Sequence, residues 1–313
     1  GERKWKNEDV WPPLSNKDHT YYLSDGEGLY TDQRTDKTFS YIYNPNDPSP
    51  TIGGKNLHDD LDQGPYDLTD SVESRGDVAI FTTEALESNL SVKGKIEVKL
   101  YVSSDRKDTD FAIRLSEVYS DGRSILLLDG IQRMRFRDGF APSDTSAMNP
   151  GTVYPITIVL DDISNTFLKG NKIRLIVSSS NYPRYNRNMN TNGEMYPDDN
   201  PDTLVNPLVA SNTIYTGTTY PSQIIFPVDT SDAAEIQVIS SDNTISVYPN
   251  PSSGKFMITG APNNSKFQVY NVSGQLVIES NNPRISMEDF EPGTYLIKIQ
   301  SDDKTFTKKI IIQ

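Results

Sequence analysis

The feature that most constrains the fold is a repeated alternation of apolar and polar residues in short segments. In residues 95–103, the apolar side chains are Ile96, Val98, Leu100 and Val102, and the residues between them are polar or amphipathic. Successive side chains of a β-strand point to opposite faces, so this spacing predicts a strand with one buried face. Residues 110–118 show the same spacing, with Arg114 and Ser116 expected to point outward. The expected inward-facing residues of this second segment are Phe111, Ile113 and Leu115.

Further segments of this kind follow one another along the chain. No run of ten or more residues has a convincing helical period of 3.6. Strands at this spacing, separated by turn signals, predict an all-β chain with a jelly-roll β-sandwich. The other strands expected in this region are 78–82, 124–129, 153–160, 172–179 and 223–228. The turn signals are Asp121-Gly122, Asp129-Gly130, Pro150-Gly151 and Lys169-Gly170-Asn171.

Residues 1–76 have a different character. They are rich in Asp, Asn, Pro, Gly and Tyr and show few clean strands. Their many large aromatic residues argue against a free linker. We therefore expect residues 1–76 to be a long extended segment that wraps and packs on the jelly roll of residues 77–228 and on another domain. The aromatic residues are Trp5, Trp11, Tyr21, Tyr22, Tyr41 and Tyr43.

A second boundary is expected near the C-terminus. Residues 229–243 are small, polar and acidic, which is typical of a linker. Strand patterns then resume on a shorter spacing in residues 244–313, which predicts a small Ig-like β-sandwich near the lower size limit for a stable core. The strands expected there are 245–248, 255–259, 267–271, 275–279, 295–300 and 305–312.

Composition excludes several classes of function. The 313 residues suggest about two domains, and a net charge of −13 argues against a nucleic-acid partner. The apolar runs are too short to span a membrane. The absence of Cys excludes disulfides and thiol nucleophiles. The first residues include neither a Met nor an apolar signal segment, so we expect the chain to begin within a longer gene product.

No catalytic or metal-binding residue is assigned from the sequence. The Gly-x-Ser-x-Gly pentad of a nucleophile elbow does not occur. His19 and His58 are expected in polar loops, where a solvated loop histidine is the better interpretation than a general base. Three acidic clusters, at 59–62, 105–110 and 198–202, favour solvated turns, with calcium as the lesser alternative. For a buried Asp110, the expected partner is Arg133 or Arg135.

The C-terminal segment carries the most specific motifs. The blocks are VYPNPSSGKF at 247–256, VYNVSGQL at 269–276, EPGTYLIK at 291–298 and KKIIIQ at 308–313. In this order and position they closely resemble the type A C-terminal sorting domain of the type IX secretion system of Bacteroidetes; the alternative is an ordinary Ig-like appendage such as an adhesion module. The residues that carry the resemblance are Tyr248, Pro249, Asn250, Pro251, Gly254, Gly274, Gly293 and Tyr295.

The resemblance implies a route and a destination. An upstream signal peptide would take the protein across the inner membrane, and residues 244–313 would engage the type IX machinery for passage across the outer membrane. The sorting domain of that family is usually removed, which implies a cut in residues 229–243. The expected location is secreted or at the cell surface.

The main body resembles a second family. Its blocks include WKNEDVWP at 5–12, DVAIFTTE at 77–84, DTDFAIRL at 108–115, DGIQRMR at 129–135 and SSSNYPRY at 178–185. They resemble the C-terminal non-catalytic domain of X-Pro dipeptidyl-peptidases, cocaine-esterase-like hydrolases and α-amino acid ester hydrolases. The resemblance implies an α/β-hydrolase domain upstream as partner, which would hold the whole catalytic triad, and it implies no cofactor.

Two loops are candidates for contact with the substrate or with that partner. In cocaine-esterase-like members, the loop after a Gly-Gly pair reaches the acyl pocket, which implies that Asn56, Leu57 and His58 line it. Asn56 and His58 depart from the apolar residues of those relatives, and a surface turn built on Gly53 and Gly54 is the alternative. The second loop would contact the hydrolase domain or the mouth of its cleft, or be a hydrogen-bonded Ω-loop. Its candidate residues are Tyr182, Arg184, Tyr185 and Arg187.

Three hypotheses of function follow. The first is the C-terminal part, non-catalytic by itself, of a secreted serine hydrolase of X-Pro dipeptidyl-peptidase or α-amino acid ester hydrolase type. The second is a carbohydrate- or surface-binding β-sandwich passenger without enzymatic activity, which an aromatic row on one sheet face would favour. The third is an inert β-scaffold carried by the secretion machinery.

Overall fold

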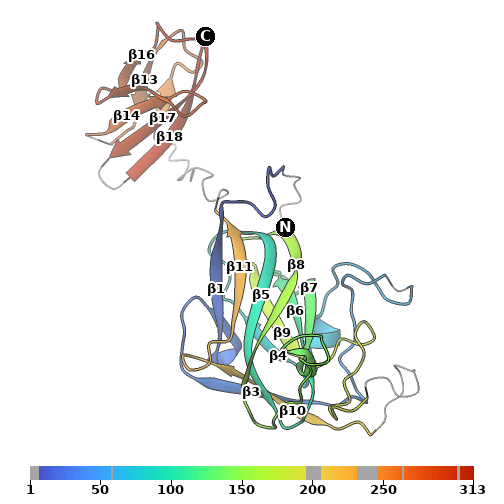
Figure 1. Cartoon of the computed structure of the whole chain (residues 1–313). Coiled ribbons are helices and arrows are strands. Elements are labelled where there is room, and N and C mark those ends of the chain that lie inside the picture. Colours follow the sequence, from blue (N-terminus) through green and yellow to red (C-terminus); the bar gives the residue numbers. More distant parts are fainter. Residues whose placement is uncertain (1–6, 58, 195–205, 231–244, 263, 302–303) are drawn as a thin grey trace. The chain divides into compact units, whose positions relative to one another are not determined.

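The chain forms two compact units, Gly1–Thr230 and Ser231–Gln313. The structure, a computed structural model, describes residues 7–57, 59–194, 206–230, 245–262, 264–301 and 304–313. Figure 1 shows that both units consist mainly of strands, which confirms the all-β prediction. Three single helical turns are present in the described residues, at Asp25–Glu27, Thr69–Glu73 and Met134–Phe136. None of the described helices is long and apolar enough to cross a membrane.

In the described part of the first unit, eleven strands form one curled sheet. Ten of them follow the order β3-β10-β5-β11-β1-β2-β4-β9-β6-β7, and β8 pairs with β5. β7 also contacts β8, so the sheet folds back on itself and encloses a core. The strands are β1 (Asn16–Ser24), β2 (Gly28–Tyr30), β3 (Lys37–Tyr43), β4 (Ala79–Thr82), β5 (Leu90–Ser104), β6 (Asp110–Val118), β7 (Ser124–Arg133), β8 (Tyr154–Phe167), β9 (Lys172–Ser178), β10 (Ala210–Thr216) and β11 (Gln223–Asp229).

The predicted inward faces of β5 and β6 do form the core. All seven apolar residues expected to face inward are fully buried. The expectation that the other face of β6 points outward to solvent was wrong. Arg114 and Ser116 on that face are also buried. The reason is a covering layer in which Leu68 and Val72 pack on the outer side of β7 and β9. Arg114 is satisfied within that layer, since its Nη2 donates to the Pro50 carbonyl at 2.9 Å.

Residues 1–76 contain more sheet structure than the sequence indicates. β1 lies between β11 and β2, and β3 pairs with β10. The inward face of β3 consists of Tyr41 and Tyr43, with Phe39 partly buried. Tyrosine is amphipathic, so tyrosines at every second position give a weaker signal for a strand than aliphatic residues do. The described residues of 44–78 contain no strand and supply the covering layer.

The second unit is a small sandwich of two sheets in its described part. β13 lies between β12 and β16, and the other sheet has the order β15-β14-β17-β18. Its core contains Phe256, Val269, Ile297 and Ile310, all buried. The strands are β12 (Ser246–Tyr248), β13 (Lys255–Thr259), β14 (Lys266–Tyr270), β15 (Leu276–Ser280), β16 (Arg284–Ser286), β17 (Gly293–Ser301) and β18 (Lys304–Ile312). The alternation predicted all of them except the three-residue β16.

A buried ion pair joins the beginning of the first unit to its end. Lys93 Nζ lies 2.5 Å from Asp229 Oδ2 and 2.5 Å from Glu8 Oε1, and Ser15 donates to the other Asp229 oxygen at 2.6 Å. The side chains of Lys93 and Asp229 are 4% and 0% exposed. The N-terminal segment is therefore held against the last residue of β11. Of the predicted linker 229–243, residues 231–243 lie outside the described residues.

Candidate functional site

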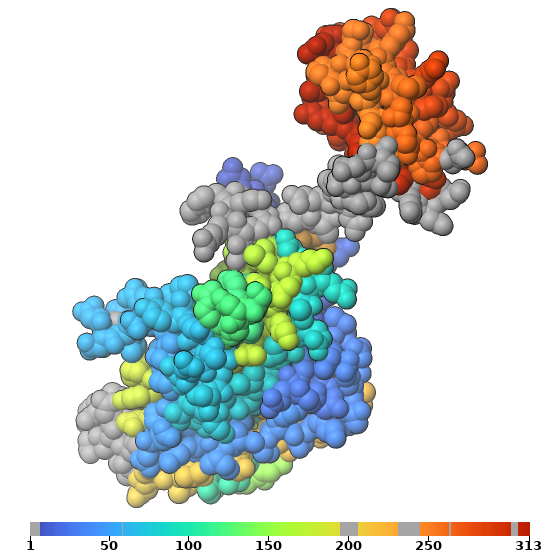
Figure 2. Space-filling view, turned by 180° about the vertical axis from the view of Figure 1, so that it is seen from behind, coloured from blue at the N-terminus to red at the C-terminus, as the bar shows by residue number. Residues whose placement is uncertain are grey.

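Residues 53–64 form a loop whose two ends are tied together. The backbones of Gly54 and Gly64 exchange hydrogen bonds of 2.8 and 3.0 Å. Asn56 is buried, and its amide nitrogen donates to the carbonyls of Gly53 and Asp62, each at 3.0 Å. Figure 2 shows the loop, in light blue, projecting from the first unit. A rigid base therefore presents the loop residues to the outside.

Gly53 is a position where no other residue fits. Its φ is +63°, and a Cβ there would lie 2.5 Å from the Gly64 carbonyl oxygen. We expect Gly53→Ala to destabilise the loop by about 1–3 kcal/mol, because strain and a backbone clash act together. Limited trypsin digestion should then cut faster after Lys55. The matched control is Gly26→Ala, since Gly26 has a φ of +68° but open space around it. Equal effects at both positions would show that the clash is unimportant.

A second segment, after β9, lies against this loop. Tyr182 N–H donates to the Ser49 carbonyl at 3.1 Å, and Thr51 N–H donates to the Tyr182 carbonyl at 2.7 Å. The backbone N–H of Arg184 donates to Thr51 Oγ1 at 3.1 Å. These contacts bring together two segments that are about 130 residues apart in the sequence.

Arg184 connects the two segments to the sheet. One of its Nη atoms donates to the Lys55 carbonyl, and its Nε lies 3.1 Å from Asp129 Oδ2. Asn181 donates to the same carboxylate oxygen at 2.8 Å. Burial by itself would lower the pKa of Arg184, but Tyr185 and Asp129 outweigh that effect and raise it. The guanidinium therefore stays charged and acts as a fixed brace between β7 and the loop.

The two segments enclose an open pocket of about 600 Å³. Leu57 is 92% exposed and forms an apolar edge of it. The lining residues are Lys55, Asn56, Leu57, Asp60, Leu61, Tyr182, Pro183, Arg184 and Tyr185. The structure thus brings together five of the seven residues predicted from the two loops. Arg187 stacks over the Tyr182 ring at 4.5 Å, and His58 lies outside the described residues.

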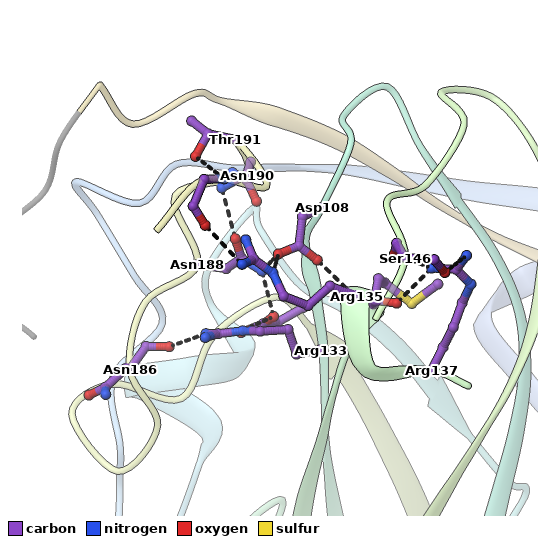
Figure 3. Close-up of polar contacts among 12 residues, drawn as sticks. Asp108, Arg133, Arg135, Arg137, Ser146, Asn186, Asn188, Asn190 and Thr191 are labelled. Atoms are coloured by element: carbon purple, nitrogen blue, oxygen red, sulfur yellow. Dashed lines mark hydrogen bonds and ion pairs between the residues drawn. The ribbon is translucent and has the colours of Figure 1, made fainter. Parts of the chain in front are cut away.

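A buried polar network holds the second segment against β6 and β7 (Figure 3). Arg133 pairs with Asp110 at 2.9 Å, and Arg135 pairs with Asp108 at 2.6 Å. Asn188 donates to both carboxylates, at 3.1 and 2.7 Å. Burial, and then the charge of Asp110, raise the pKa of Asp108 against the opposing effect of Arg135. The network anchors the 178–192 segment to β6 and β7, and it identifies Arg133 as the partner of Asp110.

The described residues show neither a catalytic triad nor a metal centre. His19, wrongly expected in a solvated loop, lies within β1 and is half-buried because β1 pairs with β11 there. Burial lowers its pKa. Its ring lies edge-on to Tyr21 at 4.9 Å, and no described carboxylate binds it. No group of three or more described His, Asp and Glu residues could hold a metal ion. The acidic cluster at 198–202 lies outside the described residues.

Asp129 is the site residue that the sequence interpretation missed. Asp129-Gly130 was expected to be a turn, but both residues lie inside β7. A Cβ on Gly130 would lie 2.8 Å from a Leu160 methyl, so the glycine permits close packing of β8 on β7. The dipeptide Asp-Gly is typical of a turn, but it can also lie inside a strand with the aspartate buried. Only the three-dimensional position of the groups that bind the aspartate distinguishes the two cases.

Comparison with family models gives two matches. Residues 1–225 match the X-Pro dipeptidyl-peptidase C-terminal non-catalytic domain. Residues 246–313 match the secretion system C-terminal sorting domain. Among curated proteins, the cocaine esterase of Rhodococcus sp. is 35% identical over 238 residues, which are 73% of this chain and 40% of that protein. The chain thus spans well under half the length of this relative.

Solved structures with the same fold include two hydrolases. An aminopeptidase from a marine sediment archaeon, Thaumarchaeota archaeon, matches with a TM-score of 0.65 and 24% identity over 73% of this chain and 39% of its own. An α-amino acid ester hydrolase matches with a TM-score of 0.58 and 24% identity over 67% of this chain and 36% of its own. At this identity the two structures establish the β-fold of the first unit.

Proposed function

We propose, on the premise that this chain belongs to the family of X-Pro dipeptidyl-peptidase C-terminal non-catalytic domains, that it is the non-catalytic part of a secreted serine hydrolase. The sorting domain at 246–313 directs export through the type IX secretion system, so the protein is secreted or displayed at the cell surface. In this proposal residues 1–76 also contact the hydrolase domain, and residues 229–243 contain the cut that removes the sorting domain.

The observation that carries the proposal is the convergence of the two loops at one pocket. Leu57 is almost fully exposed, although the ends of its loop are held together by the backbone hydrogen bonds between Gly54 and Gly64. Burying a leucine is worth about 1.5–3 kcal/mol, so an exposed leucine at a fixed position is suited to a contact with another domain. We infer that the hydrolase domain covers this edge and that the pocket forms one wall of its substrate cleft.

The chemistry would be acyl transfer, performed elsewhere in the polypeptide. A serine, activated by a histidine and a carboxylate, would attack an ester or amide carbonyl. The C–O or C–N bond would break, the histidine would pass the serine's proton to the departing alcohol or amine, and water would then hydrolyse the acyl-enzyme. This chain would contribute the cleft wall, which excludes water and positions the acyl group. The named relatives are a cocaine esterase, an aminopeptidase and an α-amino acid ester hydrolase. They support esters and amides of small acyl or aminoacyl groups as substrates.

Leu57→Asp tests the proposed wall. In the polypeptide that also contains the hydrolase domain, we expect kcat/KM for alanine p-nitrophenyl ester and for Ala-Pro-p-nitroanilide to fall at least about 10-fold, the effect of losing one apolar contact and introducing a charge. Thermal unfolding should be unchanged because Leu57 has few contacts within this unit. Phe140→Asp is the matched control, since Phe140 is 83% exposed and lies outside both residues 1–76 and the pocket. An unchanged kcat/KM in Leu57→Asp would contradict the proposal that the pocket forms a wall of the substrate cleft.

Glycan binding is a second candidate, favoured by an aromatic cluster. Tyr101 and Tyr215 are cross-strand partners on the outer face of β5 and β10. The Tyr220 ring lies 5.5 and 5.2 Å from their rings. Aromatic rings of this kind can stack on the C–H face of a sugar. Calorimetric titration of the chain with xylohexaose and cellohexaose tests this function: a binding signal that Tyr220→Ala abolishes would support it, and absence of a signal would reject it.

A further inference from the structure

One sheet face of the sorting unit carries an exposed row of three side chains. Tyr248 on β12 is the register partner of Met257 on β13, and Met257 is the partner of Arg284 on β16. Tyr248 is 76% exposed and Met257 38% exposed, and Arg284 is exposed as well. Alternation places all three on the outer face, because their neighbours Phe256, Ile258 and Ile285 are buried in the core.

The outer face of the other sheet is different because its polar groups satisfy one another. Glu279 pairs with Lys266 at 2.8 Å and accepts from Gln268 at 2.7 Å, and Tyr270 donates to Gln268 at 3.0 Å. In the three-stranded sheet, Lys255 is paired with Glu288 at 2.7 Å. Among the described residues Arg284 has no ion pair. The row therefore combines a ring, a thioether and an unpaired guanidinium, a composition typical of protein contact sites.

The neighbouring motif residues have a different role, which is to close the fold. The Asn250 side chain donates to the Lys309 carbonyl at 2.8 Å and accepts from the Ile311 N–H at 3.0 Å. Ser252 N–H donates to the Ile311 carbonyl at 2.8 Å, and Gln313 N–H donates to the Ser252 carbonyl at 2.9 Å. These bonds satisfy the outer edge of β18, which would otherwise be open. Among the residues that the structure describes, the Tyr248 side chain makes no hydrogen bond of this kind.

We propose that the row of Tyr248, Met257 and Arg284 is the surface by which the type IX machinery recognises the sorting unit, and that the machinery meets it with an apolar pocket next to a carboxylate. The proposal rests on the assignment of residues 246–313 as a sorting domain.

Charge supports an acidic partner. Residues 246–313 contain seven Lys and Arg and six Asp and Glu, whereas residues 1–230 contain 23 and 34. An acidic surface of the machinery would repel the first unit and attract the unpaired Arg284. Such a partner would bind the sorting unit of this chain in preference to the first unit.

The test is export of the chain, placed behind a signal peptide, from a bacterium that has a type IX secretion system. Tyr248→Ser and Arg284→Glu should each lower the exported fraction at least about 5-fold, with accumulation in the periplasm, as expected for loss of a central contact. Tyr248→Phe should be exported normally. The matched controls are Val272→Ser, at an apolar residue that is 83% exposed on the β14–β15 hairpin, and Lys298→Glu on the other sheet.

Thermal unfolding of each purified chain separates recognition from folding. Tyr248→Ser and Arg284→Glu should unfold at the same temperature as the unchanged chain, whereas Asn250→Ala should lower the unfolding temperature of the sorting unit. Normal export of both row variants, or an equal loss in Val272→Ser, would overturn the proposal. Deletion of residues 246–313 should abolish export. If export survived the deletion, the sorting assignment itself would be wrong.

Discussion

Replacing Lys93 with methionine is expected to destabilise the first unit by about 3–5 kcal/mol, which is typical of breaking a buried ion pair on one side. The substitution removes the ammonium group that lies 2.5 Å from Asp229, whose side chain is fully buried and also accepts from the Ser15 hydroxyl. It also removes the contact with Glu8 that holds the N-terminal segment. For a unit of this size the loss corresponds to a decrease of roughly 6–20 °C in unfolding temperature, measurable by calorimetry.

Two further variants identify the cause of that loss. Lys99→Met removes a surface lysine whose pair with Glu97 is about half exposed, and it should cost less than about 1 kcal/mol. Lys93→Met combined with Asp229→Asn should recover part of the stability, because the remaining buried group is then neutral. A cost below about 1 kcal/mol for Lys93→Met, or a double variant no more stable than the single one, would contradict the buried pair.

Arg184→Met is expected to have the largest effect on function. It removes the brace between the 53–64 loop and β7 and leaves the Asp129 carboxylate with Asn181. Loss of a charged hydrogen-bonding partner should cost about 1–3 kcal/mol of stability. Displacement of the loop by about 1 Å should lower kcat/KM of the polypeptide with its hydrolase domain by roughly 10–100-fold. Steady-state kinetics with alanine p-nitrophenyl ester measure this effect.

The control for this variant is an exposed arginine pair of the same kind. Arg123 binds Asp121 at 2.8 Å, and both side chains are more than half exposed, so Arg123→Met should change neither stability nor kcat/KM measurably. If Arg184→Met lowered stability but left kcat/KM within about twofold, the loop would have no part in the cleft.

The strands with aliphatic alternation could be predicted from the sequence, and the strands with polar or aromatic inner faces could not. β5 and β6 have Val, Ile, Leu and Phe at every second position, and their expected inner faces are buried. β10 places Ala210, Asn212, Ile214 and Thr216 inward, so half of its inner face is polar. Asn212 can be buried in this face because its amide nitrogen donates hydrogen bonds to Thr109 and Ser179. Long-range partners of this kind cannot be read from a local pattern.

The candidate site shows the same limit. Motif resemblance identified the 53–60 loop and the Tyr182–Arg187 segment separately, but the pattern did not bring them into one pocket. Their meeting depends on the backbone contacts of Ser49 and Thr51 with Tyr182 and on the buried Asp129. That aspartate had been interpreted as part of a turn. Asn56 lines the pocket between the two segments, and its amide nitrogen donates to two carbonyls of its own loop; that it lines an acyl pocket stays a prediction.

The most direct test of the central claim is labelling of the native exported polypeptide with a fluorophosphonate, followed by peptide mass spectrometry. The probe reacts with the activated serine of a serine hydrolase. The account predicts one labelled serine, within a Gly-x-Ser-x-Gly sequence that belongs to the same polypeptide and lies outside residues 1–313. Absence of labelling, or a label on a serine within residues 1–313, would contradict the assignment of this chain as the non-catalytic part of a secreted serine hydrolase.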